Sequence, residues 1–536
     1  MQKVTAIKNI KKFTEPAKCG LISKIDTYGK IMLLGLIIMA GLVFYLLNAT
    51  KSGLWYDEAI EFYYSKYMTG TVPGGCGTVN MLERCLRTFQ PPLYNILMFF
   101  WLKIFDSEFT FRLAGILTTM FGTVGIFLAV DEINPRGIWS NLGALFYLFT
   151  PGVVFYGLEC GEYNLMLCMI AWTVYFHNRI FKRNDLKSIL GFIIFSCLSV
   201  YSQYGAAFII LGMYITAAVF IIRAKKRKTL KQFAILSVAA LFMAAAPLIT
   251  IYLIPQMNKQ GSLSVSHQPF FGRGLLIDFT IGFSDMLASM FGEFAITGIL
   301  IIFALSFISL FVKPKQMIYP FITVFVTWVL YFVSVCCSVY GFNFWDPDSI
   351  GSSNLGGKYS FFFIPCLVVL MSSGISILTE MIKEKSRLLF VTAGIVIVIF
   401  TLCFCATEVR KQKYESWNKD EMREAYAVWY DRGAYRSKTL VHQLDDALFN
   451  FYLEHDSRLD DSYNGSIESA DLWIRSAGYD EMKDNLEQMG YLSADEYYFL
   501  APVDSNYDVF LSVVHDAGYE TEVLFDGKTK LYSVTK

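Results

Sequence analysis

Long apolar segments alternate with short polar breaks along the first 406 residues of the chain. Segments of spanning length lie near 29–47, 109–130, 138–157, 161–181, 188–203, 205–222, 231–254, 290–312, 317–340, 359–381 and 388–406. A helix that crosses a bilayer needs about 20 such residues, so the pattern predicts a polytopic α-helical membrane protein of about 11 spans. An odd number of spans places the two termini on opposite sides of the membrane.

One further apolar stretch, residues 91–105, is left out of this count. It is short and begins with two prolines, and counting it would move the basic stretch 223–228 to the outer side. We therefore predict a juxtamembrane or re-entrant helix within one large external loop, residues 48–108.

Lysine and arginine residues cluster in several breaks between the apolar segments. The clusters lie at 8–12, 182–183, 223–228, 313–315 and 383–387. By the positive-inside rule they mark the cytoplasmic side of the plasma membrane. Residues 1–28 are basic and polar, and no small-residue cleavage site follows the first apolar run. We therefore expect a cytoplasmic N-terminal segment and a retained first span.

The composition changes after residue 406, where apolar runs shorten to strand length and charged residues return. Residues 407–536 are long enough for one compact domain. The pattern predicts helices at 419–429, 479–489 and 509–517, strands at 439–442, 472–475 and 497–500, and a hairpin at 522–534 that turns at Asp526-Gly527. Alternating elements of this kind indicate a small α/β sandwich, which the span count places outside the cell.

The overall composition narrows the class of protein. Of the 536 residues, 54% are hydrophobic, and the 46 basic residues balance the 46 acidic ones. This excludes an ordinary soluble protein and gives no reason to expect nucleic acid as a partner. Cys76 and Cys85 lie in the predicted external loop, where a disulfide and two free thiols both stay open.

A pair of adjacent carboxylates directly follows the first apolar segment. Residues 53–59 read Gly-Leu-Trp-Tyr-Asp-Glu-Ala. Asp57 and Glu58 thus lie where the chain leaves the membrane, within reach of a lipid-anchored substrate. A solvated loop acid is the alternative, but the position and the aromatic neighbours favour a functional role for Asp57. Trp55 and Tyr56 suit either an interfacial aromatic belt or the stacking of a sugar.

Several motifs occur in a characteristic order. They are Tyr-Asp-Glu-Ala at 56–59, Pro-Pro-Leu-Tyr at 91–94, Trp-Leu-Lys-Ile-Phe at 101–105, Phe-Arg-Leu-Ala-Gly-Ile-Leu at 111–117, the turn 156–163, Lys358-Tyr359 with Pro365, and the tail opening 420–425. This order resembles the polyprenyl-phosphate-sugar-dependent glycosyltransferases with the GT-C fold. That group includes the protein O-mannosyltransferases and the lipid A aminoarabinose transferase.

The resemblance implies a GT-C-like catalytic domain over residues 29–406 and a reaction outside the membrane. The donor would be a monosaccharide on a polyprenyl phosphate, and the acceptor an envelope glycan, lipid or protein. A single displacement with inversion needs a general base, for which Asp57 is the candidate, with Glu58 orienting it or the acceptor. The leaving phosphate needs cationic groups. Lys358 and Arg112 are the first candidates, although such residues can also snorkel at the interface.

Further residues are assigned by the same resemblance. Lys103 and Arg273 are weaker candidates for the donor phosphate. The acceptor or sugar site would draw on Trp55, Tyr56, Gln90, Glu159, Glu162 and Tyr163. The chain departs from many relatives in having Gln90 in place of a basic residue before Pro-Pro-Leu, and Gly161 in place of arginine.

Two questions stay open in the sequence. A divalent cation is one cofactor that the external loops could hold, with His267 as its candidate ligand. A multi-span transporter or flippase of lipid-linked saccharide is the alternative to an enzyme. It predicts charges deep in several spans and an internal repeat, and neither is evident in the sequence.

Overall fold

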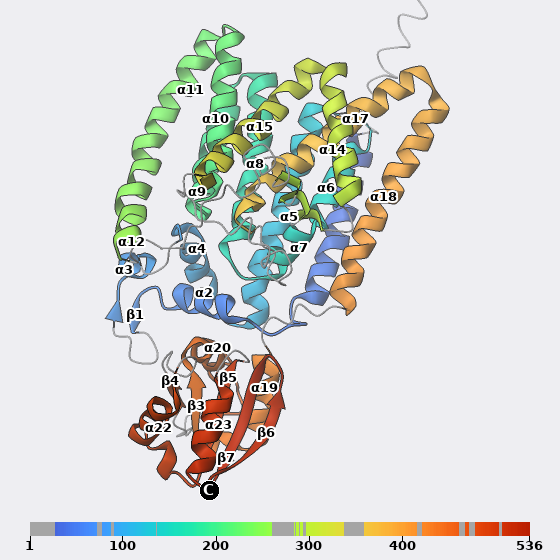
Figure 1. Cartoon of the computed structure of the whole chain (residues 1–536). Coiled ribbons are helices and arrows are strands. Elements are labelled where there is room, and N and C mark those ends of the chain that lie inside the picture. The colour runs from blue at the N-terminus through green and yellow to red at the C-terminus, as the bar shows by residue number, and fades with distance from the viewer. Residues whose placement is uncertain are drawn as a thin grey trace, which may run out of the picture. The chain divides into compact units, whose positions relative to one another are not determined.

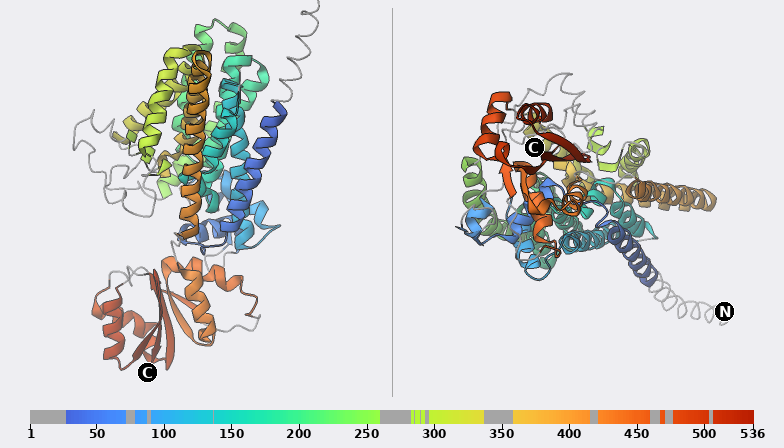
Figure 2. Two further views of the ribbon diagram at one scale, coloured as in Figure 1. Left: turned by 90° about the vertical axis from the view of Figure 1, so that its right-hand side faces the viewer. Right: turned by 90° about the horizontal axis from the view of Figure 1, so that it is seen from below.

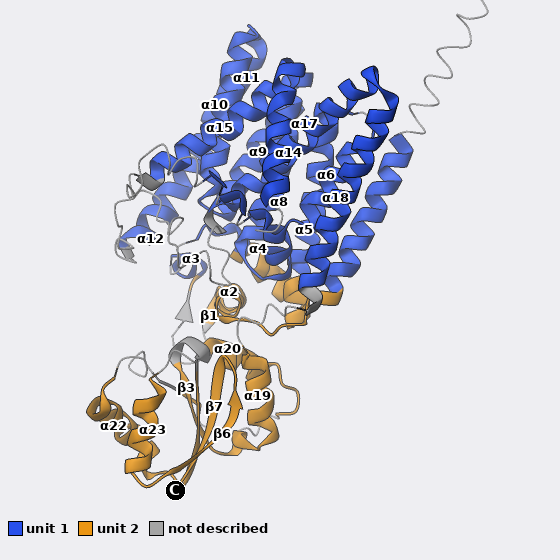
Figure 3. Ribbon diagram, turned by 45° about the vertical axis from the view of Figure 1, so that its right-hand side comes forward, with its two compact units in different colours: residues 1–46, 81–94, 113–411 blue, residues 47–80, 95–112, 412–536 orange. Residues whose placement is uncertain are grey.

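The computed structural model describes residues 27–536 (Figures 1 and 2), apart from 72–77, 87–89, 136, 260–282, 285, 289, 293–295, 337–357, 415–420, 460–466, 471–476 and 503–505. The chain forms two compact units (Figure 3). Unit 1 contains residues 1–46, 81–94 and 113–411, and unit 2 contains residues 47–80, 95–112 and 412–536. Much of the predicted external loop therefore packs in the same unit as the tail.

The apolar part of the chain is helical, as predicted. Its helices are Thr27–Asn48, α3 (Met81–Cys85), α4 (Leu93–Leu102), α5 (Glu108–Ile133), α6 (Trp139–Leu148), α7 (Pro151–Leu158), α8 (Glu162–Arg183), α9 (Leu186–Ser202), α10 (Ala206–Arg223), α11 (Arg227–Ala240), α12 (Ile254–Lys259), α14 (Ile296–Val312), α15 (Pro314–Cys336), α17 (Ile364–Lys385) and α18 (Arg387–Tyr414). Two π-helical stretches, Leu241–Ala245 and Leu248–Leu253, join α11 to α12, and the 3₁₀ helix η5 (Lys358–Phe363) precedes α17.

Fewer helices than predicted are long and apolar enough to cross a membrane by themselves. Seven qualify among the described residues, or eight if the bent pair α6 and α7 forms one span. The two helices of that pair meet at 55°, and Pro151 begins α7. Proline cannot continue a helix from the preceding turn, which accounts for the break. The helices α9 and α14 are apolar but have 17 described residues each, so they are not among the seven.

Burial divides the spans of unit 1 into central and peripheral helices. In an apolar 18-residue stretch of the span Ser360–Lys385, which contains α17, 94% is buried, whereas the corresponding stretches of Arg227–Asn258 and Arg387–Lys411 are 6% and 17% buried. Apolar side chains on the peripheral helices face outward, as a lipid solvent allows. Close packing at the centre uses small residues: a Cβ at Gly374 of α17 would lie 2.6 Å from Ser306 of α14.

Ion pairs of unit 1 gather at the ends of helices. Lys30 Nζ lies 3.0 Å from Asp131 Oδ1, and Arg183 Nη2 lies 3.0 Å from Glu132 Oε2. Lys313, between α14 and α15, is 2.8 Å from a carboxylate oxygen of α17. These are ends that the sequence assigns to the cytoplasmic side, so the predicted topology groups them on one face.

Unit 2 holds a five-stranded sheet with the strand order β4-β3-β5-β7-β6. Its elements are α2 (Tyr56–Lys66), β1 (Gly70–Thr71), β2 (Thr78–Val79), α19 (Met422–Asp431), β3 (Lys438–His442), α20 (Gln443–Glu454), β4 (Ile467–Ala470), α22 (Tyr479–Gln488), β5 (Glu496–Pro502), α23 (Tyr507–Asp516), β6 (Glu520–Asp526) and β7 (Thr529–Thr535). Strand β3 is parallel to β4 and β5, whereas β7 is antiparallel to β5 and β6.

Helices cover both faces of this sheet, which confirms the predicted α/β sandwich. On one face Phe499 of β5 stacks on Phe510 of α23, with ring centroids 3.9 Å apart. On the other face Trp429 of α19 donates a hydrogen bond to Thr439 of β3 over 2.9 Å. The hairpin of β6 and β7 turns at Asp526-Gly527 as predicted. The strand predicted at 472–475 lies outside the described residues, and α20 and β4 were not predicted.

Candidate active site

The acidic pair lies in the first turn of α2, in unit 2. Tyr56 begins the helix, so Asp57 and Glu58 are its second and third residues. Carboxylates are favourable there because the first turn of a helix carries unpaired N–H groups and a partial positive charge. Glu58 uses this position directly, since its Oε2 accepts a hydrogen bond from the N–H of Trp55 over 3.3 Å.

The two carboxylates have different surroundings. Glu58 is 2% exposed and accepts two hydrogen bonds from Arg112, 3.1 Å from Nε to Oε1 and 2.8 Å from Nη2 to Oε2. Asp57 is partly exposed, and within the described part of the chain its carboxylate has no ionic partner. Glu58 is therefore held by contacts within the protein, whereas Asp57 is accessible.

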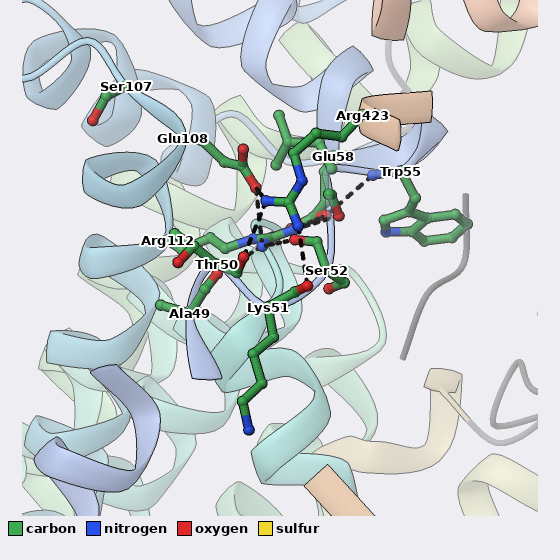
Figure 4. Close-up of polar contacts among 12 residues, drawn as sticks. Ala49, Thr50, Lys51, Ser52, Trp55, Glu58, Ser107, Glu108, Arg112 and Arg423 are labelled. Carbon is green, nitrogen blue, oxygen red and sulfur yellow. Dashed lines mark hydrogen bonds and ion pairs between the residues drawn. The ribbon is translucent and has the colours of Figure 1, made fainter. Parts of the chain in front are cut away.

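Arg112 belongs to the first turns of α5 and is buried, with 2% exposure. Besides Glu58 it donates to Glu108 and to the carbonyls of Ala49, Ser52 and Gly53, over 2.6–3.3 Å (Figure 4). A planar guanidinium suits such a set because its five N–H groups point in fixed directions. These contacts favour a structural role for Arg112, and its predicted phosphate role stays a prediction.

Two residues of the tail also reach the segment before α2. Arg423 of α19 donates to the carbonyls of Thr50 and Lys51, each over 3.0 Å (Figure 4). Tyr452 of α20 accepts a hydrogen bond from the N–H of Leu54 over 2.7 Å. No role follows from the sequence for either residue, although Arg423 lies in the tail opening 420–425. Both lie more than 300 residues from their partners, and no local pattern reports a contact of that range.

The far end of α2 carries a second set of polar contacts. Lys66 Nζ lies 2.9 Å from Asp106 Oδ2, and Nε2 of His455 lies 3.1 Å from Asp106 Oδ1. Burial raises the pKa of Asp106, but hydrogen bonds from His455 and Lys66 outweigh it and lower the pKa below its usual value. Burial lowers the pKa of His455, but its hydrogen bonds with Asp106 and the Phe451 carbonyl raise it above the usual value.

The remaining phosphate candidates are placed less completely. Lys103, just after α4, is exposed, and its Nζ lies 4.0 Å from the ring centroid of Phe99. Lys358 begins η5, and Arg273 lies outside the described residues. The donor-phosphate role of all three stays a prediction.

The other predicted acceptor or sugar residues belong to unit 1. Glu159 follows α7, and Glu162 and Tyr163 begin α8, where they are 4% and 8% exposed. The ring of Tyr163 packs on Tyr156, with centroids 4.7 Å apart. The carbonyl of Gln90 accepts a hydrogen bond from a unit 1 side-chain amide over 2.8 Å. The sugar and acceptor roles of these residues stay predictions, as do those of Trp55 and Tyr56 beside the acidic pair.

The metal prediction is not tested by the described residues. They include no group of three or more His, Cys, Asp and Glu residues arranged to hold an ion. His267 lies outside them, and so does Cys76, so the question of a disulfide with Cys85 is not tested either.

Comparisons with known proteins place this geometry in a family context. Residues 89–251 match the family described as dolichyl-phosphate-mannose-protein mannosyltransferase. The fold is similar to that of ArnT from Cupriavidus metallidurans in the apo state, with a TM-score of 0.55 and 10% identity over 93% of this chain and 97% of that chain. The oligosaccharyltransferase of Archaeoglobus fulgidus has a TM-score of 0.49 and 11% identity over 90% of this chain and 69% of that chain.

No curated protein sequence matches the chain significantly. The family match and the fold nevertheless agree with each other and with the motif order along the chain. Together they support a multi-pass membrane glycosyltransferase with the GT-C fold.

Proposed function

We propose that the chain transfers a monosaccharide from a polyprenyl-phosphate-linked donor to a cell-envelope acceptor at the outer face of the plasma membrane. The observation that carries the proposal is the division within the acidic pair. Glu58 is neutralised by Arg112, whereas Asp57 is accessible on the same helical turn. A general base must reach the proton it removes, and only an accessible carboxylate can do so.

The reaction is a single displacement. The acceptor hydroxyl attacks the anomeric carbon as the bond from that carbon to the phosphate oxygen breaks, which inverts the configuration. Asp57 takes the hydroxyl proton, and the bonding electrons leave with the polyprenyl phosphate. The departing phosphate gains negative charge, so cationic side chains rather than a general acid are needed. Lys358 is the first candidate for this role, with Lys103 and Arg273 as weaker ones, and Arg112 remains a candidate beside its structural contacts.

Glu58 then has a supporting role. Its ion pair with Arg112 has a side-chain exposure of 3% on each partner, so little solvent screens it. Removing one partner of such a pair leaves an uncompensated buried charge. Glu58 therefore orients Asp57 through the helix that both residues share.

Release of polyprenyl phosphate tests this function. Purified full-length protein is given a panel of polyprenyl-phosphate sugars with envelope extract, and free polyprenyl phosphate is measured for the wild type and Asp57→Asn. We expect release with at least one donor and a loss of about 10²–10⁴-fold in the variant, the usual contribution of a general base.

The matched control is Asp480→Asn, because α22 also begins with Tyr-Asp-Glu and Asp480 is exposed there. This control should release polyprenyl phosphate at the wild-type rate. Equal release by wild type and Asp57→Asn would show that another residue is the general base. Absence of release with every donor, together with translocation of lipid-linked sugar in vesicles, would support a flippase instead.

A further inference from the structure

Five consecutive backbone carbonyls, from Ala49 to Gly53, accept hydrogen bonds from two arginine side chains (Figure 4). Arg112 binds the first, fourth and fifth of them, and Arg423 binds the two between. The segment is neither helix nor strand, so no regular backbone ladder satisfies these groups. Its conformation is instead set by side chains from α5 and from α19 of the tail.

The row of contacts continues toward the acidic pair. Leu54 is fully buried, and its N–H donates a hydrogen bond to the hydroxyl of Tyr452. Tyr452 as a residue is 8% exposed. The next N–H, that of Trp55, donates to Glu58. Each residue from Ala49 to Trp55 thus has a backbone group bonded to a named side chain, and Asp57 lies two residues beyond Trp55.

Gly53 permits the closest of these approaches. A Cβ at this position would lie 2.8 Å from the Tyr452 hydroxyl oxygen and 3.1 Å from Cβ of Arg423. Both distances are shorter than side chains normally tolerate, so any larger residue would push the tail residues away. The glycine that opens the Gly-Leu-Trp-Tyr-Asp-Glu-Ala motif is therefore matched to two residues of the tail.

The charges in this cluster also fit together. Glu108 Oε1 lies 3.3 Å from Nη1 of Arg112 and 3.6 Å from Nη1 of Arg423. A carboxylate between two guanidinium groups offsets their mutual repulsion, which is strong where solvent is scarce. Arg423 is therefore placed by an ion pair as well as by its two carbonyl contacts.

We propose that Arg423 and Tyr452 are positioning residues for the transfer reaction, and that through them the C-terminal region fixes the segment that carries Asp57. This inference rests on the proposed function. The two residues act on the backbone of residues 50–54 and not on the substrate. Displacement of a catalytic group by about 1 Å can cost about 10²-fold in rate, so an anchor of this kind acts on catalysis.

The test measures initial rates per folded molecule for full-length Arg423→Ala and Tyr452→Phe. We expect kcat to fall about 100-fold and about 10-fold respectively, with KM for the polyprenyl-phosphate sugar within about 2-fold of wild type. Arg423→Lys should fall between, because one ammonium group cannot reproduce the fork that spans two carbonyls.

Matched controls come from the same region. Arg432 directly follows α19 and contacts only Glu522 among the described residues, so Arg432→Ala is the control for Arg423→Ala. Tyr498→Phe removes a hydroxyl that is bonded to Glu496 and is the control for Tyr452→Phe. Both controls should keep the wild-type kcat. A general loss of stability in the tail would instead lower the yield of every variant and leave kcat per folded molecule unchanged.

Hydrogen exchange gives a readout that is independent of activity. The peptide covering residues 49–58 should exchange faster in Arg423→Ala and Tyr452→Phe than in the wild type. In an Asp57→Asn background, neither substitution should lower the residual rate further, because both act through Asp57. Wild-type kcat in the two variants, or additive losses in that background, would overturn the proposal. An inactive wild type would overturn the proposed function itself.

Discussion

Two helices of unit 2 begin with the same three residues, Tyr-Asp-Glu. In α2 the glutamate is buried against Arg112 and the aspartate is partly exposed beside it. In α22 both Asp480 and Glu481 are exposed, and Tyr479 donates a hydrogen bond to Asp516 over 2.7 Å. The same three residues thus begin both helices, but those of α2 lie in a cluster of polar contacts and those of α22 lie at a solvated surface.

The difference lies in the partners that the rest of the chain supplies. Acidic residues in the first turn favour helix formation in both places, because they offset the partial positive charge of the helix end. Arg112 contacts α2 itself, and Arg423 and Tyr452 contact the segment just before it. A Tyr-Asp-Glu motif therefore predicts a helix start, and its function depends on which distant residues meet it.

The largest expected effect on stability is that of Arg112→Ala. The substitution leaves Glu58 buried without its cation and frees the carbonyls of Ala49, Ser52 and Gly53. Breaking a buried ion pair costs about 3–5 kcal/mol, so we expect a much lower melting temperature in detergent. A melting temperature close to that of the wild type would show that the cluster at α2 is no more constrained than α22.

Gly53→Ala should have the next largest effect. The added Cβ meets Tyr452 and Arg423, and overpacking of this kind costs about 1–3 kcal/mol. Thermal unfolding of the full chain measures it. The control is Gly478→Ala before α22, where a Cβ meets no atom of the described residues within 4 Å. Equal shifts for both substitutions would contradict the proposed fit between Gly53 and the tail.

The far end of α2 should give a smaller, pH-dependent effect. The pKa of His455 is raised, so its contribution is complete below about pH 6.5 and is lost as pH rises through its folded pKa. The pKa of Asp106 is lowered, so its contribution is complete above about pH 4 and is lost as pH falls through its folded pKa. Asp106→Asn should therefore destabilise the protein more at pH 5.5 than at pH 8.5.

The size of this effect is limited by solvent. Asp106 has a side-chain exposure of 42%, and such a pair contributes roughly 1 kcal/mol or less. Because Asp106 also pairs with Lys66, part of the contribution should persist at the higher pH. Melting temperatures of wild type and Asp106→Asn across the range check the sign, and a difference that grows with pH would contradict it.

The smallest effect is expected for Glu481→Gln. This residue is the α22 counterpart of Glu58 and is exposed to solvent. Surface substitutions away from special contacts usually change stability by less than about 0.5 kcal/mol. Thermal unfolding and the rate of polyprenyl phosphate release should both match the wild type. A loss comparable to that of Glu58→Gln would remove the contrast between the two helices.

Parts of this structure follow from local sequence. Apolar length predicts the helices of unit 1, and Asp526-Gly527 predicts the hairpin turn, because each depends on neighbouring residues alone. The bend at Pro151 divides one apolar segment into two helices, so fewer single helices can cross the membrane. A count of apolar residues does not reveal this bend. Arg112 is recognisable as a cation near the interface, but its acceptors are carbonyls some 60 positions away along the chain.

The contacts of the tail with residues 50–54 could not be predicted from the sequence. Arg423 and Tyr452 are ordinary residues of amphipathic helices, and α20, which carries Tyr452, was itself missed. Their significance appears only when the fold brings together segments almost 400 positions apart. Arg423 lies in the tail opening 420–425, but neither that motif nor any periodicity in the sequence indicates which residues it contacts.

The most direct test of the division between Asp57 and Glu58 compares Asp57→Asn with Glu58→Gln. Each variant is measured beside its α22 counterpart, Asp480→Asn or Glu481→Gln. Polyprenyl phosphate release per folded molecule and melting temperature are recorded for all four variants. Our prediction is that Asp57→Asn loses release while keeping the wild-type melting temperature, that Glu58→Gln mainly lowers the melting temperature, and that both α22 variants match the wild type. Retained release in Asp57→Asn, with release abolished in a stable Glu58→Gln, would contradict it.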